Sequence, residues 1–151
     1  MDLISEVKIA AAALPRKITV ILANMGEANM LLDKIPVDEY PIMLVLPFTV
    51  VDNREVSGLW AGTVDFNAML LDRDASKTTL DYDTSEVEIQ FTAPLRRLAR
   101  RFFNELNKSE LLFQPQVISN VSYTPTYGEF DAHVHGVIVR VSLKIAEGNE
   151  C

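Results

Sequence analysis

Asp131, His133 and His135 are the residues of this sequence whose types and spacing come closest to a chemical site. They alternate along one expected strand, so their side chains point to the same side, and imidazole with carboxylate is a common ligand set for zinc or iron. The chain has 2 histidines. Two imidazoles and one carboxylate leave a closed metal site short of ligands, so we expect no metal and no other cofactor.

The strand that carries these histidines changes character at Gly136. Beyond the glycine, Val137, Val139 and Val141 share the parity of the histidines, while Val134 lies opposite. If the strand buries one face, the apolar residues before Gly136 and those after it cannot all point into the same core. Either a bulge at Gly136 turns the strand over, or the segment before it leaves the core as a hairpin arm. In both cases we expect the histidines to be solvated or at an interface.

Other signatures of catalysis or ion binding fail in this sequence. The stretch Asp72–Asp83 has the acidic spacing of a calcium loop, but Lys77 stands where the sharp turn needs glycine and Asp83 replaces the bidentate glutamate. The serines lie in no G-x-S-x-G elbow, and the glycines form no phosphate-binding loop. Cys151 is the last residue, where chains usually fray. We therefore expect that the protein is not an enzyme.

Arg96, Arg97, Arg100 and Arg101 form two i, i+4 pairs on the polar side of an expected helix. Three interpretations are open: they grip phosphates, they pair with acids of a neighbouring subunit such as those in Asp72–Glu88, or they simply solvate the helix. The net charge of −7 makes the chain a poor general binder of nucleic acid, because that binding needs cations to neutralise phosphates. We expect protein partners and no sequence-specific nucleic acid.

Length and composition indicate an ordinary globular protein. The 151 residues suit a single domain, residues 1–151, and 48% of them are apolar. The longest uncharged stretch is too short for the roughly 20 residues of a membrane span, so we expect no membrane partner. A secretory signal would begin with basic residues, but acids follow Met1. A single cysteine cannot form a disulfide within the chain. We therefore expect that the protein is made and kept in the cytoplasm.

The first half of the chain predicts a helix and at least two strands. Leu3–Leu14 has helical spacing and ends at Pro15, and a strand follows from Lys17 to a turn at 24–26. Glu27–Ile35 is ambiguous between a short helix and a strand. Tyr40–Phe48 is an almost unbroken apolar run, typical of a strand covered on both faces.

A hairpin loop, a long strand and a helix follow. Leu59–Leu71 alternates clearly and predicts a half-buried strand, with Val51–Gly58 as the loop before it. Asp72–Tyr82 is polar without a period, so we expect a surface loop. Ser85 and Glu88 fit a capping box, and an amphipathic helical repeat follows from Phe91. Either this helix kinks at Pro94, or it begins near Thr92 with Pro94 in its first turn, and we favour the second.

The last third predicts two strands, Pro115–Tyr123 and Glu129–Ile145, joined by Thr124–Gly128. The order of elements indicates an α+β fold: a mostly antiparallel sheet with helices packed on one face and a long C-terminal β-hairpin.

Four segments carry a resemblance to a known family: the strands EYPIMLVLPF and GLWAGTVDFNAMLLDRD, the helix PLRRLARRFFNELNKSELL, and the final hairpin ending FDAHVHGVIVRVSLKI. In this order they resemble the tail-terminator or tail-completion (head–tail connector, neck) proteins of tailed bacteriophages. The resemblance runs from about Leu3 to Ile145. It implies a non-enzymatic virion protein, assembled in the host cytoplasm, that forms a homo-oligomeric ring. The ring terminates the tail or joins it to the capsid connector, and its partners are other copies and other neck, portal-connector or tail proteins.

By the same resemblance, the arm Thr124–Gly136 and the loop Val51–Gly58 are the expected interface elements. With the arginines, the candidate subunit-interface residues are Arg96, Arg97, Arg100, Arg101, Tyr123, Tyr127, Phe130, Asp131, His133 and His135. Tyrosine, phenylalanine and arginine are enriched at the centres of interfaces. The alternative function is a small cytoplasmic ferredoxin-like regulatory or ligand-binding domain, and an enzyme using the two histidines ranks last.

Overall fold

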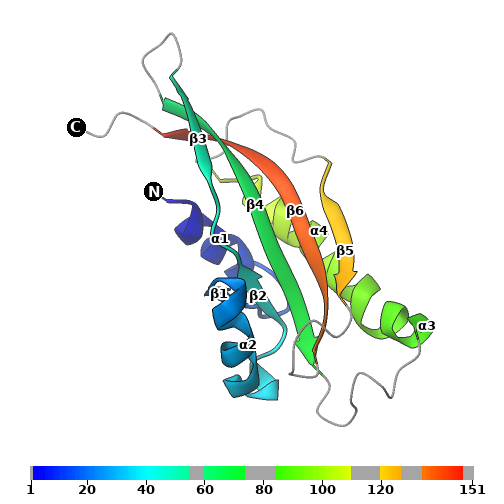
Figure 1. Cartoon of the computed structure of the whole chain (residues 1–151). Coiled ribbons are helices and arrows are strands. Elements are labelled where there is room, and N and C mark those ends of the chain that lie inside the picture. Colours follow the sequence, from blue (N-terminus) through cyan, green and yellow to red (C-terminus); the bar gives the residue numbers. More distant parts are fainter. Residues whose placement is uncertain (1, 55–59, 74–83, 110–119, 127–133, 148–151) are drawn as a thin grey trace.

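The structure is a computed structural model that describes residues 2–54, 60–73, 84–109, 120–126 and 134–147 (Figure 1). Its elements in chain order are helix α1 (Leu3–Ala12), strand β1 (Thr19–Leu22), helix α2 (Met25–Lys34), a 3-10 turn (Val37–Glu39), strands β2 (Ile42–Val45), β3 (Val50–Arg54) and β4 (Trp60–Arg73), helix α3 (Thr84–Val87), a π-helical turn (Glu88–Thr92), helix α4 (Ala93–Leu106), and strands β5 (Ser122–Thr126) and β6 (Val134–Glu147).

The six strands form one sheet in the order β1-β2-β4-β6-β5, and β3 pairs with the part of β4 that β2 does not reach. Only β1 and β2 run parallel among the described pairings, and β5 and β6 make the C-terminal hairpin. The expected α+β class and mostly antiparallel sheet are therefore confirmed.

Helices α1 and α4 cover one face of the sheet, as expected. Their buried side chains pack with the inward residues of β4 and β6, among them Phe66, Leu70 and Val139. Phe66 stacks on Phe102 of α4, with ring centroids 6.5 Å apart. This face is the larger core, and it fixes the orientation of α4 and of every side chain on its outer surface.

Helix α2 lies on the opposite face, where Ala28 and Leu32 pack on Ile42, Leu44 and Met69. The ambiguous stretch of the sequence is thus a helix, and because it covers the second face, the helices are not confined to one face as expected. It begins at Asn24, whose side chain accepts from the Glu27 N–H and donates to the Glu27 carboxylate. Because α2 covers the second face, all four residues of β2 are buried, as the apolar run predicted.

The end of α2 is tied to the sheet by one buried hydrogen bond. The Tyr40 hydroxyl donates to the Leu32 carbonyl at 3.0 Å, which gives a partner to one of the carbonyls left over at a helix C-terminus. We expect Tyr40→Phe to lower the free energy of unfolding by about 1 kcal/mol, because the ring is kept and the hydrogen bond to Leu32 is lost. Urea denaturation measures it, and an unchanged midpoint would show that water or another group replaces the hydroxyl.

Two boundaries differ from the sequence-based expectation. Residues Val50–Arg54 form strand β3 although Val51–Gly58 was expected to be loop. β2 pairs only with residues 68–71 of β4, so the backbone groups of residues 60–64 need another partner, and β3 supplies it. Likewise Thr124–Thr126 is not a turn, because it pairs with Gly136–Ile138.

The helix before α4 also differs. The chain is helical from Thr84, well before Thr92, and continues through Pro94 by way of the π-helical turn. The Ala93 N–H donates to the Glu88 carbonyl, one residue further back than in an α-helix. Proline has no N–H to donate and its ring clashes with the carbonyl four residues before it, and the wider turn accommodates both effects.

Gly136 carries no bulge, and the expected change of face is wrong. The ladder between β4 and β6 runs unbroken from Trp60 opposite Glu147 to Arg73 opposite Val134. No flip is needed because both faces are covered at this end: Val134 lies in the α2 cluster, and His135 lies against the π-helical turn. The segment from Val134 to Gly136 is therefore part of the sheet and not of a free arm.

Candidate functional site

The arginines of α4 project from the side of the helix that faces away from the sheet. The buried side of α4 carries Leu95, Leu98, Phe102 and Leu106. Since an α-helix repeats every 3.6 residues, this burial places Arg97, Arg100 and Arg101 outward, and all three are exposed.

These arginines line a groove of about 380 Å³ together with Arg16, Pro94 and Leu98. We call this set of six residues the arginine groove. Arg16 comes from the loop after α1, so the groove joins two segments far apart in the sequence. Its described lining contains four guanidinium groups and no acid, which makes it a site for an anionic group.

Two of the groove arginines are held in place by neighbours. Arg16 makes an ion pair with Asp72 at 2.9 Å. The guanidinium of Arg100 lies over the ring of Tyr123, 5.7 Å from its centroid, in cation–π geometry. Burial raises the pKa of Tyr123 above its usual value, although Arg100 opposes this, so the phenol is neutral at physiological pH and leaves the charge of Arg100 uncompensated.

Arg97 and Arg101 make no ion pair within the described part of the chain. Arg96 differs from them, because it is half-buried and pairs with Glu88 at 2.9 Å in its own helix. Asp72 and Glu88, which the sequence suggested as acids for a neighbouring subunit, are thus already paired within their own chain. Of the other acids between them in the sequence, three lie outside the described residues: Asp74, Asp81 and Asp83.

Of the second expected cluster, Asp131, His133 and His135, only His135 lies in the described part of the chain. His135 is buried with 1% of its surface exposed, and its ring stacks on Phe91 at 4.2 Å. The expectation that it is solvated or at an interface is therefore wrong, because the π-helical turn places Phe91 over it. Tyr127, Phe130, Asp131 and His133 lie outside the described residues, and in the described ranges no three His, Cys, Asp or Glu side chains cluster as metal ligands would.

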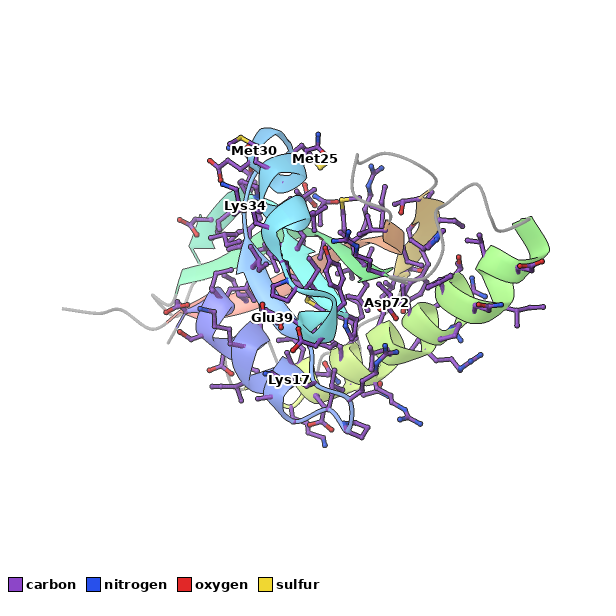
Figure 2. The ribbon with its side chains drawn as sticks, turned by 90° about the horizontal axis from the view of Figure 1, so that it is seen from below. Lys17, Met25, Met30, Lys34, Glu39 and Asp72 are labelled. Carbon is purple, nitrogen blue, oxygen red and sulfur yellow. The ribbon has the colours of Figure 1, made fainter. Side chains whose placement is uncertain are left out.

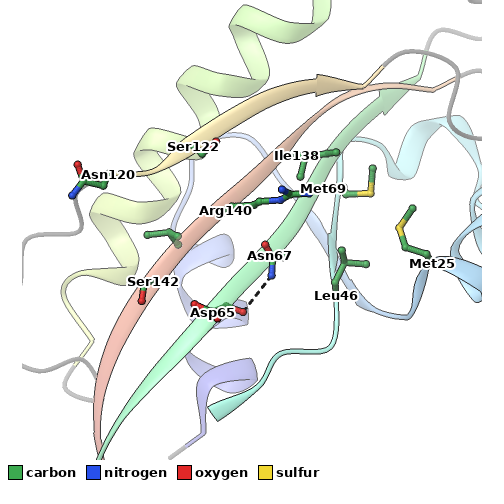
Figure 3. Close-up of a pocket in the computed structure, with 11 residues that line it drawn as sticks. Met25, Leu46, Asp65, Asn67, Met69, Asn120, Ser122, Ile138, Arg140 and Ser142 are labelled. Atoms are coloured by element: carbon green, nitrogen blue, oxygen red, sulfur yellow. Dashed lines mark hydrogen bonds between the residues drawn. The ribbon is translucent and has the colours of Figure 1, made fainter. Parts of the chain in front are cut away.

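The structure also reveals a surface that sequence reasoning missed. Beside α2, the open face of the sheet is hollowed to about 910 Å³ (Figure 3). Polar side chains, including Asn67 and Arg140, line one side of this hollow, and Met25 and Met69 line the other. The alternation of Asp65 and Asn67 with buried residues marked this face as polar. Only the position of α2 makes it concave.

Helix α2 adds exposed apolar side chains next to this hollow. Met25, which is 46% exposed, lines the hollow, and Met30, which is 66% exposed, lies on the outer side of the helix (Figure 2). Exposed methionines are typical of binding surfaces. The molecule therefore presents a basic surface on α4 and an apolar one on α2, on opposite faces of the sheet.

Comparisons with known proteins add no family: the chain matches no protein-family model and no curated protein. Among the described helices, none combines the length and apolar character needed to cross a membrane.

Proposed function

We propose that this chain is a structural protein of a tailed bacteriophage virion, assembled in the host cytoplasm as part of the neck or tail. It forms a homo-oligomeric ring that terminates the tail or joins it to the capsid connector, and it has no enzymatic role. The order of elements that carries the resemblance is supported by the fold, in which α1 and α4 back a sheet that ends in the β5–β6 hairpin.

The observation that carries the proposal is the pair of unlike surfaces. A ring needs a head-to-tail contact, in which one patch of each copy meets a different patch of the next. The arginine groove and the apolar outer side of α2 are two such patches, and they lie on opposite faces of one sheet. An uncompensated basic groove in a chain of net charge −7 suits an acidic protein partner.

The test is the mass of the protein in solution and in particles. Native mass spectrometry and negative-stain electron microscopy are expected to show a closed ring, alone or on addition of the adjoining neck proteins. The position of the gene gives a second test, because a neck protein is expected to be encoded between a portal and a tail-tube protein. A stable monomer or dimer that no neck protein recruits would contradict the proposal.

The alternative, a small ferredoxin-like regulatory or ligand-binding domain, is favoured by one observation. The hollow on the open sheet face is within the size range of small-molecule sites, about 300–1,000 Å³, and Arg140 offers a charged group at its floor. Such a domain would be a monomer or small oligomer, and Arg140→Ala would remove binding of an anionic metabolite without changing the mass of the assembly.

A loop replacement tests whether the arm between β5 and β6 serves assembly. Because Thr126 and His135 are buried, the exchange for a four-residue Asn/Gly linker is confined to residues 127–133. We expect the free energy of unfolding to change by less than about 1 kcal/mol, because loop length has a weak effect on stability. Incorporation into particles should be lost.

The matched control for this replacement keeps the loop length and changes Tyr127 and Phe130 to alanine. If these aromatic residues are the interface anchors, the control also fails to enter particles while it stays folded. A linker variant that unfolds would show that the arm belongs to the core instead.

A further inference from the structure

No described acid of the same chain pairs with Arg97, Arg100 or Arg101 of the arginine groove. Arg97 and Arg101 are exposed, and the guanidinium of Arg100 lies over the ring of Tyr123. Arg16 and Arg100 are held by Asp72 and Tyr123, so part of the groove is set before a partner binds. Preorganised guanidinium groups bind carboxylates with less loss of side-chain entropy.

Most described acids already have a role in their own chain. They cap helices, pair with cations or accept hydrogen bonds, and they are Asp2, Glu6, Glu27, Asp72, Glu86, Glu88 and Glu105. Among the acids whose side chains the structure describes, four make no ion pair and no side-chain hydrogen bond: Asp38, Glu39, Asp52 and Asp65.

Only Asp38 and Glu39 among these four are neighbours. Both are exposed and lie in the 3-10 turn between α2 and β2. Asp52 stands alone on β3, and Asp65 lies in the hollow that also holds Arg140. A turn with two adjacent carboxylates suits two guanidinium groups that are one helical turn apart, since the Cβ atoms of such a pair are about 5–6 Å apart.

The Asp38–Glu39 turn lies on the face of the sheet opposite to the arginine groove, and a head-to-tail contact needs two different surfaces of this kind. Ile35 and Tyr40, which flank it, belong to the cluster under α2, whereas α4 packs on the other face. A second copy can therefore present its turn to the groove of the first while its own groove stays available for a third.

We propose that the Asp38–Glu39 turn of one copy docks in the arginine groove of the next, with Arg97 and Arg101 as the receiving cations. This contact rests on the proposed ring and names the two surfaces that close it. The occupant is a second copy of this chain, chosen because its free acids complement the groove.

The test uses two charge-reversed variants of the full chain, Arg97→Glu with Arg101→Glu and Asp38→Arg with Glu39→Arg. Each alone places like charges across the contact, so each is expected to weaken self-association at least about 100-fold in sedimentation velocity. An equimolar mixture is expected to restore assembly, because each variant then meets a partner of opposite charge on both sides. Asp65→Arg reverses an exposed acid that lies outside both the turn and the loop Val51–Gly58, and this control should assemble like wild type.

Each other outcome overturns the docking. If Asp38→Arg with Glu39→Arg assembles normally while wild type forms rings, the turn is not the partner and the proposed function stands. Wild type that stays monomeric with and without neck proteins removes both proposals. Equal loss in the Asp65→Arg control would show a general charge effect. If the groove instead binds a labelled DNA duplex, and only the arginine variant loses it, the partner is a nucleic acid.

Discussion

Changing Arg97 and Arg101 together to glutamate is expected to abolish ring or particle assembly and to leave the subunit folded. The buried side of α4, with Leu95, Leu98 and Phe102, is untouched by this change. Both arginines are exposed, and surface substitutions of this kind usually alter the free energy of unfolding by about 0.5 kcal/mol or less. Urea denaturation should therefore give a midpoint close to that of wild type.

The effect on assembly is expected to be much larger, because burial at an interface changes what a charge pair contributes. An exposed salt bridge contributes about 0–1 kcal/mol, whereas removing one partner of a desolvated pair costs about 3–5 kcal/mol. Light scattering of the purified variant and its recovery in particles measure the loss.

A control with the same change in net charge separates a specific contact from general repulsion. Lys8→Glu with Lys108→Glu alters two exposed lysines, one on α1 and one just after α4, that lie outside the proposed contact, and it should assemble normally. Normal assembly of the arginine variant would instead show that α4 is only a solvated face, and the virion proposal would then rest on the resemblance alone.

Gly136→Val is expected to destabilise the fold strongly. A Cβ atom at this position would overlap the Leu70 carbonyl oxygen and the side chain of Leu71 on the neighbouring strand. The carbonyl belongs to β4, which pairs with β6 over its whole length, so it cannot move without opening the centre of the sheet. We expect a loss of about 3 kcal/mol or more from a total stability of about 5–15 kcal/mol.

Gly26→Ala is the matched control for this prediction. Its Cβ would approach only the Asn24 side-chain oxygen, at 3.3 Å, and alanine is the better helix former. The control should therefore change stability by about 1 kcal/mol at most. A Gly136→Val protein that unfolds at the wild-type urea concentration would show that the two strands separate more easily than their pairing suggests.

The sequence by itself determined the elements whose hydrophobic period is unambiguous. Val64 and Phe66 alternate with Thr63, Asp65 and Asn67 and lie buried on one face of β4, as the period of two requires. The apolar repeat of α4 likewise placed Arg97, Arg100 and Arg101 on the outer side of a helix before any contact was known. These features depend on the order of residues within one segment, so local reasoning reaches them.

Tertiary structure decided what covers each face and which charges find partners. The burial of His135 depends on Phe91, which is far from it in sequence, and Val50–Arg54 is a strand because β4 has an edge to fill. Arg16 lines the groove although it is far from α4 in the sequence, and Arg96 pairs with Glu88 and does not line the groove. The hydrophobic period predicts neither contact. A residue's type and spacing fix the direction of its side chain, but its partner is fixed by the segments that packing brings beside it.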